Sequence, residues 1–256
     1  WLYEDRLRLN GIKLVLDGAL GSRGALLKSD YNDDPGNQGL ALLDPTELRN
    51  LMSRAAMDRF QTAVHAIGDK ANEEVLNAII DLSETYSGDR RWRIEHAQIL
   101  DPRDIRKFQT GGIIASMQPL HQTSDRLMAE ARLGENRLAG AYAWNSVTQN
   151  NAKLVFGSDA PVEIPNPFEG IAVAISRVDE NGEPDGGWQP DENIGRQDAL
   201  ASYTSVGAFA GFAEGRFGRL IPGEWADFIF VDRDPMLASI EQTRKINVLA
   251  TWVAGK

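Results

Sequence analysis

Apolar, strand-like runs alternate with helical segments along most of this 256-residue chain. Five of these runs are predicted to be strands: residues 12–17, 60–65, 92–96, 113–117 and 154–157. When a helix connects two strands of one sheet, the connection crosses over and the strands run parallel. The alternation therefore predicts an α/β fold built on a parallel sheet.

Helix start signals support this alternation. Asp44 as N-cap, Pro45 at the first helical position and Glu47 in a capping box predict a helix that runs to about Asp58. Asp69 is expected to cap the next helix, because apolar residues then repeat at helical spacing. Further helices are expected from residue 101 onward, around 127–144 and over 199–213.

All three histidines lie at the ends of strand-like runs. His65 closes QTAVH, His96 closes RRWRIEH and His121 follows GGIIASMQPL, while Asp159 closes KLVFGSD. A single histidine is more often structural. In a (β/α) barrel, however, the carboxyl ends of the strands carry the chemistry, so these side chains can converge on one metal ion. Alternation along a strand predicts that His96 and its neighbour Glu95 face opposite sides of the sheet.

Four of the candidate site residues keep a second interpretation. Lys13 can extend its ammonium group from a strand to water. Asp17 and Arg23 are candidates for substrate binding and also fit turn and surface positions. Asp159 fits a turn before Ala160-Pro161, although a carboxylate there can instead bind a metal and accept a proton from the attacking water.

Composition excludes several classes of partner. The formal net charge of -10 argues against nucleic acid, because phosphate binding needs a clustered basic surface. The chain has no cysteine, so any metal must use nitrogen and oxygen ligands. No apolar run approaches the roughly 18 residues of a membrane span. A small-molecule substrate and a cytoplasmic location are therefore expected, with no membrane partner.

The last part of the chain departs from this rhythm. EIPNPFEG and DENGEPDGGWQPDEN are expected to be loops, and residues 227–232 alternate as a strand after a Pro-Gly turn. We therefore expect two domains. Residues 1–215 form the partial barrel, and residues 216–256 form a segment of a small β-sandwich.

Seven motifs, taken in order, resemble the amidohydrolase superfamily. They are KLVLDGALGSRGALL, HAIGDKANEEVL, RIEHAQ, ASMQPLH, FGSDAPVE, ALASYTSVGAFAGF and GRLIPGEWADFIFVDRDP. The branch that they resemble contains the N-substituted formamide deformylases. The resemblance implies a (β/α)8 TIM barrel with one or two divalent metals, commonly zinc, beside a small β-sandwich.

The resemblance also implies roles for residues of this chain. His65 and His96 match the metal histidines of strands five and six, and Asp159 matches the catalytic and metal-binding aspartate of strand eight. Lys13 lies where some members carry a carboxylated lysine that bridges two metals. His121 matches the seventh-strand motif and is expected to be a catalytic and substrate-binding group that faces the substrate, or else to support the residues that do. The implied reaction is hydrolysis of a C–N bond of a small amide by metal-activated water, with Asp159 as proton acceptor.

One family feature is absent from the sequence. The first-strand His-x-His pair is not present, so the chain is expected to be the C-terminal part of a barrel, about strands four to eight. Two hypotheses remain. The chain belongs to a metal-dependent amidohydrolase, or it is a catalytically incomplete fragment that acts only as a folding or assembly partner. Its partner is then a second copy or a complementary N-terminal fragment.

Overall fold

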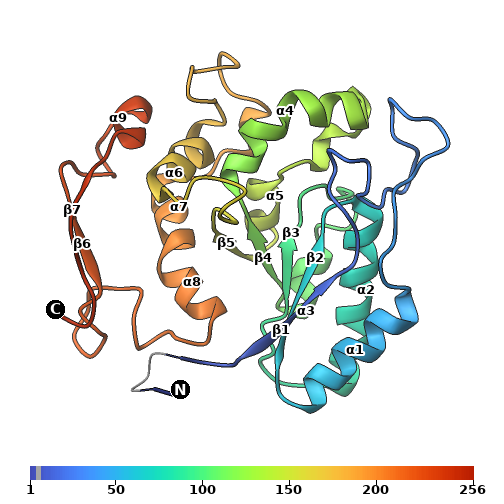
Figure 1. The fold of residues 1–256 in the computed structure, drawn as a ribbon, viewed down its shortest axis with the longest axis horizontal. Coiled ribbons are helices and arrows are strands. Elements are labelled where there is room, and N and C mark those ends of the chain that lie inside the picture. Colours follow the sequence, from blue (N-terminus) through green and yellow to red (C-terminus); the bar gives the residue numbers. More distant parts are fainter. Residues whose placement is uncertain (4–6) are drawn as a thin grey trace.

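A five-stranded parallel sheet forms the centre of the computed structural model, which describes residues 1–3 and 7–256 (Figure 1). Each strand pairs with the next strand along the chain, in the order β1-β2-β3-β4-β5. The strands are Gly11–Val15 (β1), Gln61–Ala66 (β2), Arg93–His96 (β3), Ile114–Met117 (β4) and Lys153–Phe156 (β5). The parallel sheet is confirmed, and every predicted strand end lies within two residues of the observed one.

Helices surround this sheet. They are Pro45–Met57 (α1), Asp69–Thr85 (α2), Lys107–Gly111 (α3), Pro119–Leu133 (α4), Trp144–Gln149 (α5), Pro167–Ser176 (α6), Arg196–Tyr203 (α7), Ser205–Ala210 (α8) and Ile240–Arg244 (α9), with short 3-10 helices at Glu135–Gly140 (η1) and Pro190–Glu192 (η2). Helices α1 and α2 contact β2, whereas α5, α7 and α8 contact β5. Across the described residues, none of the helices has the length and apolar character needed to cross a membrane.

The first two helices begin in different ways. A side-chain oxygen of Asp44 accepts hydrogen bonds from the backbone N–H groups of Thr46 and Glu47, as an N-cap does. The expectation for Asp69 is wrong, because it lies inside α2 and Gly68 is the cap residue. The carbonyl of Leu26, from a distant loop, accepts the hydrogen bonds of the first helical N–H groups instead.

Other helix boundaries also differ from the expectations. The helix expected at Asp101 begins only at Lys107, after a series of turns. The helix expected around 127–144 is α4, which starts at Pro119 and ends before Gly134. Part of the expected loop EIPNPFEG opens α6, and the helix expected over 199–213 breaks at Thr204. Two of these helices nevertheless carry local start signals, since Pro119 opens α4 and Asn166 caps α6 ahead of Pro167.

Part of the core lies between the sheet and helices α1 and α2, and it continues to α5 and α6. Val64 of β2 and Ile94 of β3 are fully buried, as are Met52 of α1 and Leu76 and Ile79 of α2. Full burial of one such side chain contributes about 1.5–3 kcal/mol. The apolar residues that repeat at helical spacing in α2 therefore lie on the face of this helix that packs against the sheet.

A second, two-stranded sheet lies apart from the first (Figure 1). It pairs Phe228–Val231 (β6) antiparallel with Val248–Trp252 (β7), and the rings of Phe228 and Trp252 stack at 5.7 Å. Helix α9, between these strands, packs on α6, where Arg244 Nη1 lies 2.7 Å from Glu169 Oε2. This small unit is thus attached to the α/β body largely through one helix pair.

Candidate active site

The three histidines come together at the carboxyl edge of the parallel sheet. His65 is the next-to-last residue of β2, His96 ends β3 and His121 lies in the first turn of α4. The ring centroids of His65 and His96 are 4.5 Å apart, and those of His96 and His121 are 6.0 Å apart. Strand ends that are far apart in the sequence therefore deliver three imidazoles to one place.

A backbone irregularity at the end of β3 brings His96 into this group. The ladder pairs His65 with Glu95, so these two side chains share a face of the sheet. Simple alternation would direct His96 to the other face. His96 instead has a φ of 75°, and Ala97 follows with 43°, in the left-handed region that non-glycine residues rarely adopt. Alternation ends there, and the His96 ring packs against His65.

Both strand-end histidines are held neutral. Burial disfavours the imidazolium form and lowers the pKa of His65 to about 4, with a further contribution from the neighbouring His96. Burial likewise lowers the pKa of His96. The charges of Lys13 and Asp159 act on both rings, so these two residues border the same space. At neutral pH, His65 and His96 present unprotonated nitrogen atoms, the form that binds a metal.

Gln118 orients His96, a role that no sequence motif had indicated. The side-chain amide of Gln118 donates to the carbonyl of Ser116, which turns its oxygen Oε1 toward His96 Nδ1 at 2.9 Å. A carbonyl oxygen accepts hydrogen bonds, so Nδ1 carries the proton and Nε2 carries the lone pair. The only sequence signal was a polar residue directly before the Pro-Leu-His segment.

Replacing Gln118 with alanine is expected to release the tautomer of His96. Without the Gln118 acceptor, the proton is no longer held on Nδ1. The nitrogen NMR shifts of the His96 ring should then change from those of a single tautomer to those of a mixture of two. Gln118→Glu keeps an acceptor oxygen and should preserve the single tautomer. Gln109→Ala, at an exposed site on α3, serves as control. An unchanged His96 spectrum in Gln118→Ala would contradict this role.

Lys13 and Asp159 lie at the exposed border of the histidine group. Lys13 projects from the edge strand β1 opposite Ala63, and Asp159 follows β5 with a φ of 55°. In the part of the chain that the structure describes, neither side chain makes an ion pair or a hydrogen bond. Both charged groups therefore remain available to a ligand.

Asp17 occupies a different environment from the one expected for a substrate contact. Its side chain is fully buried and accepts hydrogen bonds from the backbone N–H groups of Leu26, Ile67 and Gly68. One of its oxygens lies 3.5 Å from His65 Nε2. Burial raises the pKa of Asp17 to about 6. This placement favours support of the His65 ring over direct contact with a substrate.

Arg23 lies outside the histidine group. It adopts a φ of 58° in the loop after β1, and its guanidinium donates two hydrogen bonds to Asp33, at 3.2 and 3.0 Å. Arg132 of α4 contacts the same carboxylate. The structure thus uses Arg23 to join two surface segments, and it does not bring Arg23 together with His65 and His96.

The histidines fit a divalent metal in kind but do not complete its shell. The Nε2 atoms of His65 and His121 are buried and lack a hydrogen-bond partner among the described residues. Such orphaned nitrogen atoms suit a metal ligand. No group of three or more His, Asp or Glu side chains within residues 1–3 and 7–256 stands close enough to hold an ion. The described residues therefore present histidines of suitable chemistry without forming a metal site by themselves.

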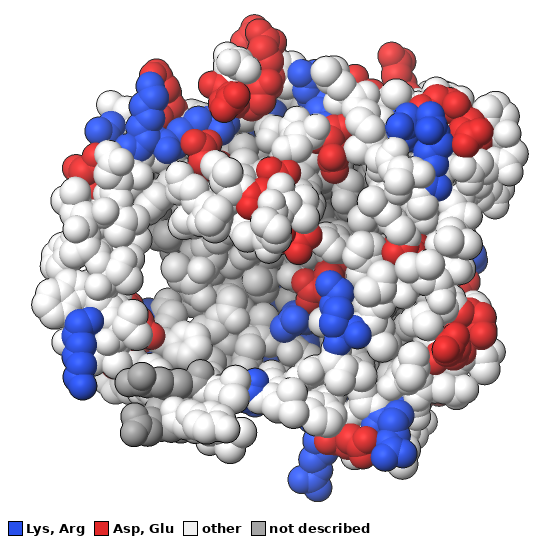
Figure 2. Space-filling model, viewed as in Figure 1, with Lys and Arg blue, Asp and Glu red and all other residues white. Residues whose placement is uncertain are grey.

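The molecule is also hollowed on the side shown in Figure 2. The hollow lies between the β6–β7 sheet and the α/β body, and charged side chains gather around its rim rather than within it (Figure 2). Figure 1 places α6, α7 and α8 beside this space. The two sheets therefore do not form one continuous packed layer.

Comparison with known sequences identifies the family. The sequence model of the amidohydrolase family matches residues 2–256. The chain belongs to this family. Protein LONG AFTER FAR-RED 3 of Arabidopsis thaliana is 38% identical over 100% of this chain and 43% of its own length. The putative amidohydrolase YtcJ of Bacillus subtilis is 33% identical over 98% of this chain and 47% of its own.

Two further comparisons agree with the predicted resemblance. An N-substituted formamide deformylase of Arthrobacter pascens is 26% identical over 97% of this chain and 45% of its own length. The crystal structure of an uncharacterized metal-dependent hydrolase from Pyrococcus horikoshii superimposes with a TM-score of 0.81 at 32% identity, covering 92% of this chain and 47% of that one. The chain spans a little less than half the length of each of these proteins.

Proposed function

We propose that this chain contributes to a metal-dependent amidohydrolase that hydrolyses a C–N bond, of the amide or N-formyl type, in a small molecule. The neutral His65–His96 pair at the carboxyl edge of a parallel sheet is the observation that carries the proposal. Family membership supports hydrolysis, and the deformylase among the relatives supports an amide-like substrate. The metal is expected to be zinc, since imidazole suits zinc well.

The residues of this chain then divide the chemical work. His65 and His96 would hold the metal, with Asp159 as a further ligand at the exposed border, and Lys13 as another once its amine is carboxylated. When bound, a divalent metal lowers the pKa of water and polarises the substrate carbonyl. Asp159 accepts the proton of the attacking water and returns it to the leaving nitrogen. His121 orients the substrate. Asp17, whose carboxylate lies 3.5 Å from His65 Nε2, supports the His65 ring.

We also propose how the fold relates to a complete barrel. The five parallel strands would be strands four to eight of a (β/α)8 barrel within residues 1–215. The β6–β7 sheet would be part of a small β-sandwich formed within residues 216–256. The similarity to the Pyrococcus hydrolase supports this arrangement. The in-sequence strand order supports it too, because neighbouring strands of such a barrel are consecutive in the chain.

Metal binding tests the proposed function. Zinc typically takes three or four protein ligands, and no three candidate side chains among the described residues lie close enough together to hold it. The chain alone should therefore bind zinc weakly, at micromolar concentration or above. His65→Ala and His96→Ala should each weaken binding by about tenfold or more, as measured by competition with a coloured chelator. His121→Ala, at the neighbouring ring, should change the affinity much less.

Two outcomes would alter this view. Unchanged zinc affinity in both His65→Ala and His96→Ala would remove the proposed metal site. Tight, stoichiometric metal in elemental analysis of the wild-type chain would instead show that a third ligand completes the shell. Lys13 and His121 would then be the first residues to replace.

A non-catalytic role as an assembly partner is the second candidate. The observation that favours it is exposed apolar surface on the β6–β7 sheet. Phe230 and Leu249 are 54% and 66% exposed, and Val253, directly after β7, is 63% exposed. Among the described strands, β1 pairs only with β2, so its outer edge is an open sheet edge. We propose that the chain associates through such surfaces, with a second copy or a complementary N-terminal fragment.

The purified chain is accordingly expected to self-associate. Large exposed apolar side chains and an open sheet edge both favour association. Light scattering should show a mass that grows with concentration in the micromolar range. Phe230→Lys together with Leu249→Lys should reduce association, whereas Leu127→Lys, at an exposed site on α4, should not. A monomer that unfolds cooperatively at all concentrations would contradict this expectation.

A further inference from the structure

A polar pocket opens at the amino-terminal edge of the sheet, away from the histidines. Its volume is about 280 Å³. Among its lining residues, Asn10 directly precedes β1, Phe60 directly precedes β2 and Arg90 lies just before β3. The amino ends of parallel strands share one edge, and the N-terminus label in Figure 1 lies near it. His65 and His96 lie at the opposite edge, so this pocket is separate from the proposed metal site.

Three arginines from three parts of the chain line this pocket. They are Arg8, Arg59 and Arg90. Arg8 donates to two backbone carbonyls at 2.8 Å, and Arg90 donates to one at 3.2 Å. A backbone carbonyl carries no net charge, so these hydrogen bonds leave the guanidinium charges uncompensated. Arg59, directly after the C-cap of α1, is exposed.

No carboxylate of the described residues forms an ion pair with this arginine group, although Glu214, which pairs with Arg91, lies near enough to interact electrostatically with Arg8. Asp89 is the one acidic residue that the pocket's described lining contains, and its carboxylate lies 2.8 Å from Nη2 of Arg91. Within the described part of the chain, none of the three lining arginines has a carboxylate within ion-pair distance. The chain as a whole has a net charge of -10. A local excess of positive charge is therefore unusual for this protein.

One donor in the group also lacks an acceptor. The Nε atom of Arg90 is buried, and it has no hydrogen-bond partner among the described residues. A buried N–H without an acceptor costs about 1–3 kcal/mol. This atom is shielded from the pocket itself, so the ligand preference follows from the accessible guanidinium donors and their charge. These favour an anion with several acceptor oxygens.

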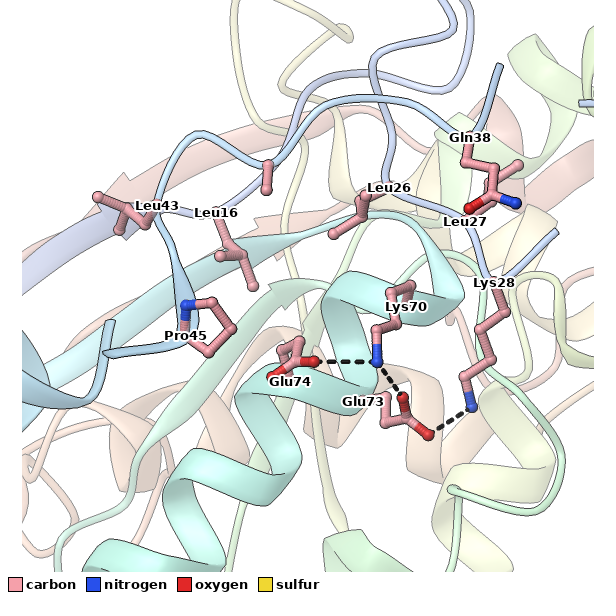
Figure 3. A pocket seen from close by; sticks show the side chains of 11 residues that line it. Leu16, Leu26, Leu27, Lys28, Gln38, Leu43, Pro45, Lys70, Glu73 and Glu74 are labelled. Atoms are coloured by element: carbon pink, nitrogen blue, oxygen red, sulfur yellow. Dashed lines mark hydrogen bonds and ion pairs between the residues drawn. The ribbon is translucent and has the colours of Figure 1, made fainter. Parts of the chain in front are cut away.

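Another cavity of the protein provides a useful contrast. It has a volume of about 450 Å³ and lies beside the first turns of α2 (Figure 3). Its lysines are paired: Lys70 lies 2.8 Å from Glu73 and 3.0 Å from Glu74, and Lys28 lies 2.9 Å from Glu73. Charges that pair internally favour neither an anionic nor a cationic ligand. The arginine pocket differs because its charges remain unpaired.

We propose that the arginine pocket binds a phosphate group, either free phosphate or the phosphate end of a small molecule. Guanidinium groups present paired N–H donors that match phosphate oxygens, and charge-assisted hydrogen bonds of this kind are strong. A phosphate dianion offsets two of the three guanidinium charges, whereas a carboxylate offsets only one. The pocket volume accommodates a phosphate with a small organic group.

Calorimetric titration with inorganic phosphate at low ionic strength tests this proposal. Wild-type protein should bind one phosphate saturably. Arg59→Gln and Arg90→Gln should each weaken binding by about tenfold or more, because each removes one charge-assisted contact. Arg106→Gln removes the same charge from an exposed site elsewhere and should change the affinity less than about twofold. Circular dichroism checks that each variant folds.

Further arms separate this site from the metal site and identify the source of the phosphate. A His65→Ala, His96→Ala double variant should keep full phosphate affinity. Tighter binding of glycerol phosphate than of inorganic phosphate would indicate a phosphorylated molecule, and the reverse order would indicate free phosphate. The proposal fails if wild-type protein shows no saturable binding, if acetate binds as tightly as phosphate, or if Arg106→Gln weakens binding as much as Arg59→Gln.

Discussion

Replacing Asp17 with alanine is expected to lower the free energy of unfolding by about 3–5 kcal/mol. The Asp17 carboxylate is fully buried and accepts hydrogen bonds from the backbone N–H groups of Leu26, Ile67 and Gly68. Alanine would leave these three donors buried without an acceptor. Each orphaned donor costs about 1–3 kcal/mol, and release of the buried charge offsets part of the sum.

Urea denaturation of Asp17→Ala beside the wild type measures this difference. Asp81→Ala is a suitable control, because the Asp81 side chain is 60% exposed and pairs with Arg49 at the surface. The control should lose less than about 1 kcal/mol. A loss of similar size in Asp17→Ala would mean that water replaces the carboxylate and satisfies the N–H groups.

The second large effect concerns the pH dependence of stability, in which two opposite contributions cancel in the wild-type protein. Burial raises the pKa of Asp17 from 3.8 to about 6, so its contribution to stability is complete below pH 4 and is lost as the pH rises through 6. Burial lowers the pKa of His65 from 6.5 to about 4, so its contribution is complete above pH 6.5 and is lost as the pH falls through 4. The two contributions, about 3 kcal/mol each, oppose one another between pH 4 and 6.

Single substitutions should separate these contributions. Relative to the wild type, Asp17→Asn should become more stable as the pH rises from 4 to 6, because the His65 contribution is no longer opposed. His65→Gln should become less stable over the same interval. The measurement is the unfolding free energy at several pH values with a chelator present. Identical pH slopes in all three proteins would show that neither group is perturbed.

Strand positions were predictable because the signal is local. An apolar run such as the one at Val64 or Ile94 is buried on both faces of a parallel sheet, whichever helices cover it. The helix at Asp44 was predictable for the same reason, since its cap and its Pro45 lie within the helix's own first turn. Asp69 was misread because the group that caps α2 is the carbonyl of Leu26, more than 40 residues away.

The candidate site was predictable only in part. The strand-end positions of His65 and His96 were sufficient to predict their approach. The side of the sheet that His96 faces depends on its left-handed φ of 75°. This conformation cannot be predicted from the sequence, because histidine rarely adopts it. The burial of Asp17 depends on two peptide N–H groups after β2, and the orientation of His96 depends on Gln118 at the start of α4. Such partners become neighbours only when the chain folds.

The strand order of the parallel sheet also has a consequence for how this chain folds during synthesis. Every ladder joins consecutive strands, from β1 with β2 to β4 with β5. Each new strand can therefore dock on the edge left by the previous one as soon as it and its preceding helix leave the ribosome. In the described five-stranded sheet, no later strand has to insert between two strands that are already paired. Growth of the sheet thus follows the direction of translation, and its pairings require only loops of one helical unit to close.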